Sequence, residues 1–275
     1  MKYSLSSFVY FNAALQDAID QTAAFGYDGI DIWGGRPHAF RRDLSEADCL
    51  ELRRQTERLG LAVASFIPAQ FRYPTCLCSP IPAIHEDSIA YIQDSILTAS
   101  RLGAPIVSVC PGHTLRGQSQ QDGWEKLKFS LLRICQFASV YRIKIAIEPA
   151  DHYETDLVNT IADAARLIAE TDMANLGVLL DSGHVHVSAE PMADAFKAAG
   201  DRLFHIHIDD NLGKRDQHLI PGEGNIDFAE FYRLVTASGY RGYLCAELSW
   251  DYTADPDMAA RQTIERLRAL ERLIE

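Results

Sequence analysis

The chain of 275 residues has no long hydrophobic run and few cysteines. No uninterrupted apolar stretch approaches the roughly 18 residues that a membrane span needs, and residues 1–8 lack the apolar core of a secretory signal. The six cysteines form no Cys-x-x-Cys pair and no regular framework, which is typical of reduced, buried thiols. These absences predict a cytoplasmic protein with no membrane partner.

The chain also has fewer basic than acidic residues. The chain has 26 Lys and Arg against 38 Asp and Glu, which gives a formal net charge of −12. Because this charge opposes binding to a phosphate backbone, nucleic acid is a disfavoured partner. The length and the 47% hydrophobic content fit either two small domains or one large α/β barrel.

What the sequence does contain is a regular alternation of short apolar runs and longer amphipathic stretches, repeated eight times without a linker. The expected strands are Tyr3–Phe11, Gly29–Trp33, Ala62–Ile67, Ile106–Cys110, Ile143–Glu148, Leu176–Asp181, Phe204–Ile208 and Tyr243–Glu247. The expected helices are Ala14–Ala24, Ser45–Leu59, Ser88–Leu102, Trp124–Tyr141, Thr160–Ala169, Pro191–Ala199, Phe228–Ser238 and Pro256–Ile274. No Gly-rich phosphate-binding turn follows the first strand, as an open doubly wound sheet would normally show. We therefore predict one domain, residues 1–275, folded as a single (β/α)8 TIM barrel with its chemistry at the C-terminal ends of the strands.

Four consecutive late strands each end in a side chain that can bind a metal: Glu148, Asp181, His207 and Glu247. Three carboxylates brought together without a cation would repel one another, and each would be costly to bury. A divalent cation removes both problems. The ligand set is mostly oxygen, which suits Mn²⁺, Mg²⁺ or Co²⁺, with Zn²⁺ also accommodated.

Each of these residues also has an ordinary structural explanation. An acidic residue after a strand often caps the next helix, and Asp181 keeps this alternative open because Ser182-Gly183 could begin a turn. Likewise, Pro221-Gly222-Glu223-Gly224 could be a tight turn without a role in binding.

Other polar and aromatic groups follow the same strands. His184 lies three residues after Asp181, and Asp216 and His218 lie in the loop that follows His207. Trp33 opens a Gly-rich polar loop that contains His38, and its flat ring could form a wall for a polyol. Lone histidines are more often structural than functional, and this reading of His38 stays open.

Taken in order, five segments resemble the sugar isomerase/epimerase superfamily of xylose-isomerase-like TIM barrels. They are Glu148-Pro149, Asp181-Ser182-Gly183-His184, His205-Ile206-His207, Pro221-Gly222-Glu223-Gly224 and Ala246-Glu247. The spacing between them is similar to that of the ketose 3-epimerases. The segment from Gly26 to Phe40, GYDGIDIWGGRPHAF, resembles the fructoselysine 3-epimerase subgroup.

The resemblance implies a metal-dependent sugar epimerase that inverts C3, the carbon next to a ketose carbonyl. It implies one metal, with Mn²⁺ favoured, held by Glu148, Asp181, His207 and Glu247, and it makes the two glutamates the acid and base on opposite faces of the substrate. Such an epimerisation passes through a cis-enediolate whose negative oxygen needs a neighbouring cation. The resemblance further implies that His184 and Arg215 hold the carbonyl side of a sugar, that Glu154 holds a terminal hydroxyl, and that the protein is a homodimer or homotetramer.

The sequence departs from the free-sugar epimerases in two places. The loop from His207 to Pro221 is longer, which leaves the match of Arg215 uncertain by a residue or two. Strands 2 and 3 offer a different set of pocket residues, so that a substrate larger than a simple hexulose is compatible with the sequence: Trp33, Arg36, His38, Phe66, Gln70 and Tyr73.

Four alternatives share this fold. An aldose–ketose isomerase of the hydroxypyruvate type would use the same metal and enediolate. An endonuclease IV-like phosphodiesterase would need further histidines after strands 3 and 4, although His184, Asp216 and His218 resemble the third metal site of that branch. A dehydratase and a non-catalytic sugar-binding barrel are the remaining alternatives, and the last does not need both Glu148 and Glu247.

Overall fold

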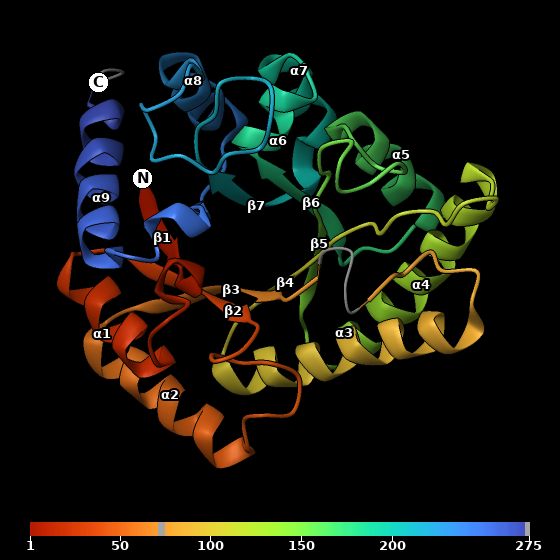
Figure 1. Cartoon of the computed structure of the whole chain (residues 1–275), viewed down its shortest axis with the longest axis horizontal. Helices are drawn as coiled ribbons and strands as arrows, with labels where there is room; N and C mark the ends of the chain where they lie inside the picture. Colours follow the sequence, from red (N-terminus) through yellow and green to blue (C-terminus); the bar gives the residue numbers. More distant parts are fainter. Residues whose placement is uncertain (71–74, 273–275) are drawn as a thin grey trace.

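The computed structural model describes residues 1–70 and 75–272 and shows eight parallel strands that close into a barrel in sequence order (Figure 1). The strands are β1 (Lys2–Ser6), β2 (Gly29–Gly34), β3 (Ala62–Pro68), β4 (Ile106–Val109), β5 (Lys144–Ile147), β6 (Leu176–Asp181), β7 (Leu203–Ile208) and β8 (Tyr243–Ala246). The last strand pairs with the first, with Ser4 opposite Cys245. The predicted (β/α)8 barrel is confirmed.

Helices surround the barrel on its outside (Figure 1). They are α1 (Leu15–Ala24), α2 (Glu46–Leu59), α3 (Pro82–Leu102), α4 (Gln120–Val140), α5 (Ile161–Thr171), α6 (Ser182–Val187), α7 (Met192–Ala199), α8 (Phe228–Ser238) and α9 (Pro256–Glu271), with short 3₁₀ turns η1 (Ser7–Tyr10), η2 (Gly200–Arg202) and η3 (Trp250–Tyr252). The apolar strands are covered on both faces, which is why their residues are almost continuously buried.

Several predicted boundaries are wrong. The first strand ends at Ser6 instead of Phe11, because the Ser6 side chain accepts a hydrogen bond from the Phe8 N–H and starts η1. The third long helix begins six residues earlier than predicted, at Pro82, where proline suits the first turn. The short helix α6 was not expected as a separate element. The predicted end of the last helix, Ile274, lies outside the described residues.

Capping side chains and left-handed glycines determine several helix ends. Ser45 and Asp48 form a capping box at the start of α2, and Gly60, Gly103 and Gly239 take the left-handed conformation that favours glycine after their helices. Among the described residues, no helix combines the length and the apolar character needed to cross a membrane.

Candidate metal centre

The four predicted metal ligands meet at one end of the barrel. Glu148 directly follows β5, Asp181 is the last residue of β6, His207 lies in β7 and Glu247 directly follows β8. One ligand-type atom from each of the four lies within 4.8 Å of the others. Parallel strands make this convergence possible because their C-terminal ends share one rim of the barrel.

His207 is at the centre of this group. Its Nδ1 atom lies 2.9 Å from Glu247 Oε2, 3.1 Å from Glu148 Oε1 and 3.8 Å from Asp181 Oδ2. Burial opposes charge on the imidazole, but Glu247 and Glu148 outweigh it and raise the pKa of His207. Burial also opposes charge on Glu247, but His207 outweighs it and lowers the pKa of this carboxyl group.

The two carboxylate oxygens of Asp181 have different surroundings. Its Oδ1 accepts a hydrogen bond from the His184 N–H and caps α6, while its buried Oδ2 has no hydrogen-bond partner among the described residues. Burial raises the pKa of Asp181 to about 6. The capping alternative and the ligand alternative therefore do not compete, because each uses a different oxygen.

This arrangement fits a divalent cation. Three carboxylates surround one imidazole nitrogen, and the buried Asp181 Oδ2, which has no hydrogen-bond partner in the described chain, is free to bind a cation. Three oxygen ligands and one nitrogen ligand suit Mn²⁺, Co²⁺, Mg²⁺ or Zn²⁺. Glu247, with its side chain 18% exposed, is the most accessible of the four side chains.

Glu154 and His184 lie beside the metal centre. Burial raises the pKa of Glu154 to about 7, with Asp216 and Glu148 adding to the rise and His184 and His218 opposing it. The ring of His184 is held by the Asp151 N–H, which donates to Nδ1 at 3.3 Å. The structure thus brings both predicted substrate residues to the same end of the barrel as the four ligand-type side chains.

A second buried acidic group adjoins the first. His218 bridges two carboxylates: its Nδ1 lies 2.5 Å from Asp209 Oδ2 and its Nε2 lies 2.5 Å from Asp216 Oδ2. His184 Nε2 lies 3.8 Å from the same Asp216 oxygen. Asp209 was not singled out in the sequence, although its position two residues after His207 on the end of an apolar strand was a usable signal.

Other predicted residues lie outside this group. Arg215 is exposed and has no ion pair or hydrogen bond within the described parts of the chain. Both ring nitrogens of His38 are engaged inside the protein, by Ser7 Oγ at 3.0 Å and by the Tyr10 carbonyl at 3.2 Å. The geometry of His38 is therefore that of a structural histidine behind Trp33, whose ring it meets edge-on at 5.9 Å.

The other residues that the sequence offered as pocket residues have the following positions. Phe66 is fully buried in the core, and Arg36 forms a surface ion pair with Asp43. Gln70 accepts a hydrogen bond from the Cys110 N–H. Tyr73 lies outside the described residues.

Trp33 belongs to an aromatic wall, which we define as Phe8, Phe11, Trp33 and Trp250. Phe8 meets Trp33 at 5.1 Å and Trp250 at 4.8 Å, both edge to face, and Phe11 meets Trp250 at 4.6 Å. Trp250 is 58% exposed and lies three residues after Glu247. The sequence predicted only Trp33, because contacts between the end of β2 and the segments after β1 and β8 depend on closure of the barrel.

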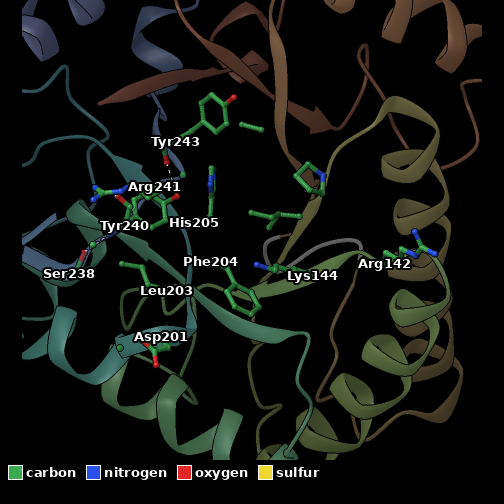
Figure 2. Close-up of a pocket in the computed structure, with 16 residues that line it drawn as sticks. Arg142, Lys144, Asp201, Leu203, Phe204, His205, Ser238, Tyr240, Arg241 and Tyr243 are labelled. Atoms are coloured by element: carbon green, nitrogen blue, oxygen red, sulfur yellow. Dashed lines mark hydrogen bonds between the residues drawn. The ribbon is translucent and has the colours of Figure 1, made fainter. Parts of the chain in front are cut away.

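The opposite end of the barrel carries a hollow of about 490 Å³ between the starts of β4, β5, β7 and β8 (Figure 2). Lys144 lies over the ring of Phe204 there, 4.5 Å from its centroid, and His205 forms part of the lining. The four ligand-type side chains are at the other rim, so this hollow is separate from the candidate metal centre.

The fold and the site define a TIM barrel with a cluster of metal-binding side-chain types at its C-terminal rim, and comparison with known proteins places it in a family. Residues 19–270 match the family described as "Xylose isomerase-like TIM barrel", and the chain belongs to this family. It is 30% identical over 256 residues to fructoselysine 3-epimerase of Shigella flexneri, with 93% of each chain covered. It is 26% identical to D-psicose 3-epimerase of Enterocloster bolteae, with 88% of this chain and 80% of the relative covered.

Solved structures agree on the fold. An L-ribulose 3-epimerase superposes with a TM-score of 0.86 at 21% identity, covering 100% of this chain and 96% of that one. A D-psicose 3-epimerase solved with D-tagatose, from Clostridium cellulolyticum H10, gives a TM-score of 0.84 at 18% identity, with 98% and 99% covered.

Proposed function

We propose that the protein is a metal-dependent sugar epimerase of the ketose 3-epimerase type, which inverts C3 of a ketose or of a ketose derivative such as fructoselysine. The observation that carries the proposal is the convergence of Glu148, Asp181, His207 and Glu247 within 4.8 Å at the C-terminal rim of the barrel. Similarity to fructoselysine 3-epimerase over 93% of the chain supports the substrate class.

In this proposal the four side chains hold one divalent cation, with Mn²⁺ favoured. When bound, the cation supplies positive charge that stabilises the negative oxygen of a cis-enediolate. Glu148 and Glu247 come from strands on opposite sides of β7, so they can flank a substrate. One glutamate removes the C3 proton from one face, and the other returns a proton to the opposite face.

The neighbouring side chains bind the sugar. Glu154, with its raised pKa, can donate or accept a hydrogen bond at a hydroxyl near neutral pH. In the proposal, His184 binds the carbonyl side of the sugar, its ring held through Nδ1 by the Asp151 N–H, and the wall around Trp33 covers an apolar face of the substrate. Arg215 contributes if its exposed loop closes over a ligand, and His38 supports Trp33 from behind.

Deuterium exchange tests the proposal. Purified protein with Mn²⁺ in D₂O is given fructoselysine, D-psicose, D-tagatose and L-ribulose in turn, and each carbon is examined by NMR. A 3-epimerase labels C3. Labelling at C1 or C2 would instead establish an aldose–ketose isomerase, and no labelling at all would leave a binding protein.

Variants test the proposed acid and base roles of Glu148 and Glu247. Glu148→Gln and Glu247→Gln are expected to lower C3 exchange by at least about 100-fold, the usual weight of one general acid or base. The exposed Glu265→Gln on α9 is the matched control and is expected to exchange normally. Full turnover in both site variants would contradict the mechanism.

By the same family likeness we propose a homodimer or homotetramer, which light scattering of the purified protein tests directly.

A further inference from the structure

A carboxylate lies in the interior of the barrel, below the candidate metal centre. Asp31 occupies the middle of β2 between the buried Ile30 and Ile32, and it is fully buried itself. Barrel interiors are normally filled by branched apolar side chains, and a buried carboxylate is costly unless other groups satisfy it. Asp31 therefore requires an explanation.

Two side chains hold one oxygen of Asp31. Ser65 on β3 donates a hydrogen bond to Asp31 Oδ2, and His205 on β7 donates to the same oxygen from Nε2 at 2.5 Å. The second oxygen, Oδ1, is buried and has no partner among the described residues. Burial opposes ionisation, but His205 and then His207 outweigh it and lower the pKa of Asp31. Two donors therefore fix one oxygen of the carboxylate and leave the other without a hydrogen-bond partner in the described parts of the chain.

His207 has a matching free atom. It lies two residues after His205 on β7, so the two rings occupy the same face of the strand, and their centroids are 5.4 Å apart. The Nδ1 atom of His207 lies against Glu148 and Glu247, whereas Nε2 is buried and unpartnered within the described chain. One ligand-type atom from each of Asp31, His205, His207 and Cys245 lies within 4.8 Å of the others.

We propose that Asp31 is a positioning residue that keeps the proton of His207 on Nε2 and so leaves the Nδ1 lone pair free for the cation. A neutral imidazole carries one proton, and a carboxylate on the Nε2 side favours the tautomer in which Nε2 bears it. Ser65 and His205 hold the carboxylate in place, and Asp31 and His207 offer ligand-type atoms within 4.8 Å of each other, a separation that one water molecule can bridge. The inference rests on the proposed metal site.

Metal affinity provides the first test, and it requires no turnover. Mn²⁺ is titrated calorimetrically into metal-free wild-type protein, Asp31→Asn and Asp28→Asn. Asp31→Asn is expected to weaken Mn²⁺ binding by about 10- to 100-fold, the usual cost of losing an outer-shell partner of a ligand histidine. Asp28 is exposed and lies three residues earlier, directly before the same strand, so its variant is expected to bind Mn²⁺ as the wild type does.

The hydrogen bond of His207 provides the second test, which uses only wild-type protein for the observation. In ¹H–¹⁵N NMR of the Mg²⁺-loaded protein, with the His207 signals assigned by His207→Gln, the Nε2–H proton is expected to resonate downfield, because it donates a hydrogen bond toward the Asp31 carboxylate. A merely structural role of Asp31 would leave the Nε2–H proton without this downfield shift. This measurement tests the link between Asp31 and His207 even if Asp31→Asn does not fold.

Three results would overturn the inference alone: wild-type Mn²⁺ affinity in Asp31→Asn, a His207 Nε2–H proton without a downfield shift in the loaded protein, or a second tightly bound ion that disappears in Cys245→Ala. The last would make Asp31 a ligand of its own metal. Failure of the wild-type protein to bind Mn²⁺ would instead overturn the proposed function, and this inference with it.

Discussion

The carboxyl group of Glu154 makes the stability of the protein depend on pH. Its pKa is raised from 4.5 to about 7, chiefly by burial, so the folded protein holds a proton that the unfolded chain releases. The stabilising contribution is fully present below pH 4.5 and is lost as the pH rises through 7. The free energy of unfolding therefore falls with pH across this window, by up to about 3 kcal/mol for this group.

Glu154→Gln should remove that dependence, because glutamine resembles the protonated acid at every pH. We expect the variant to match the wild type near pH 4 and to become more stable than it by pH 8, as measured by urea unfolding in the presence of chelator. Glu265→Gln, at an exposed position, should follow the wild-type curve. Parallel curves for wild type and Glu154→Gln would show that the carboxyl group titrates normally.

Trp250 tests whether the aromatic wall binds substrate. The ring is 58% exposed, so Trp250→Ala should fold normally. If the wall contributes binding that is equal in the ground state and the transition state, KM should rise several-fold with little change in kcat. Steady-state kinetics measure both constants, and Phe129→Ala, at a similarly exposed ring on α4, is the control. A fall in kcat with unchanged KM would argue against a binding wall.

At the scale of single residues, the sequence was sufficient to recognise a candidate site residue where a polar or charged group ends an apolar strand. Glu148, Asp181, His207 and Glu247 could all be recognised this way, because each follows or ends a strand whose limits are clear. Asp31 was missed because it lies mid-strand, and its partner His205 is 174 positions away in the chain. Only the closed barrel brings β2 and β7 face to face across its interior.

At the scale of elements, the loop after β7 depends on one buried carboxylate. Asp210 accepts hydrogen bonds from four backbone N–H groups, those of Asn211, Gly222, Gly224 and Ile226. A Cβ atom at Gly224 would lie 2.2 Å from Asp210 Oδ1 and 2.3 Å from the Asn211 carbonyl, so glycine is required there. The Pro221–Gly224 segment is thus explained as a turn built around Asp210.

Asp210→Asn should destabilise the protein by about 2–4 kcal/mol, since an amide group cannot accept all four bonds and leaves buried donors unpaired. Asp227→Asn is the matched control, because Asp227 only caps α8 through the Glu230 N–H and should cost about 1 kcal/mol or less. Chemical denaturation compares the two variants. Equal losses would mean that the four-bond cluster contributes no more than an ordinary helix cap.

The elements also show where sequence patterns stop being informative. Hydrophobic periodicity located all eight strands, and capping residues located several helix starts, because both signals are local. The end of β1 and the separate helix α6 depended on single side-chain bonds, from Ser6 and from Asp181. Periodicity carries no information about such bonds.

For the whole molecule, the proposed cation should couple binding to stability. An ion that binds only the folded state at about 100 times its Kd adds roughly 2.7 kcal/mol. For a chain of this size each kcal/mol shifts Tm by about 2–4 °C, so EDTA should lower Tm by about 5–10 °C and added Mn²⁺ should restore it. Differential scanning calorimetry measures the shift.

Glu247→Gln should reduce the EDTA-dependent shift because it removes one of the four proposed ligands. Glu265→Gln should retain the full shift. An unchanged Tm for the wild type under EDTA and under Mn²⁺ would contradict a resident cation that stabilises the fold.

The pairing of β1 with β8 has a consequence for synthesis of the chain. One edge of β1 finds its partner only when Tyr243–Ala246 has emerged from the ribosome, since Lys2 pairs with Tyr243 and Leu5 with Ala246. Until then that edge presents unpaired N–H and C=O groups that can bind another nascent chain. The barrel therefore closes late, and the risk of aggregation is concentrated in the interval between translation of the first strand and translation of the last.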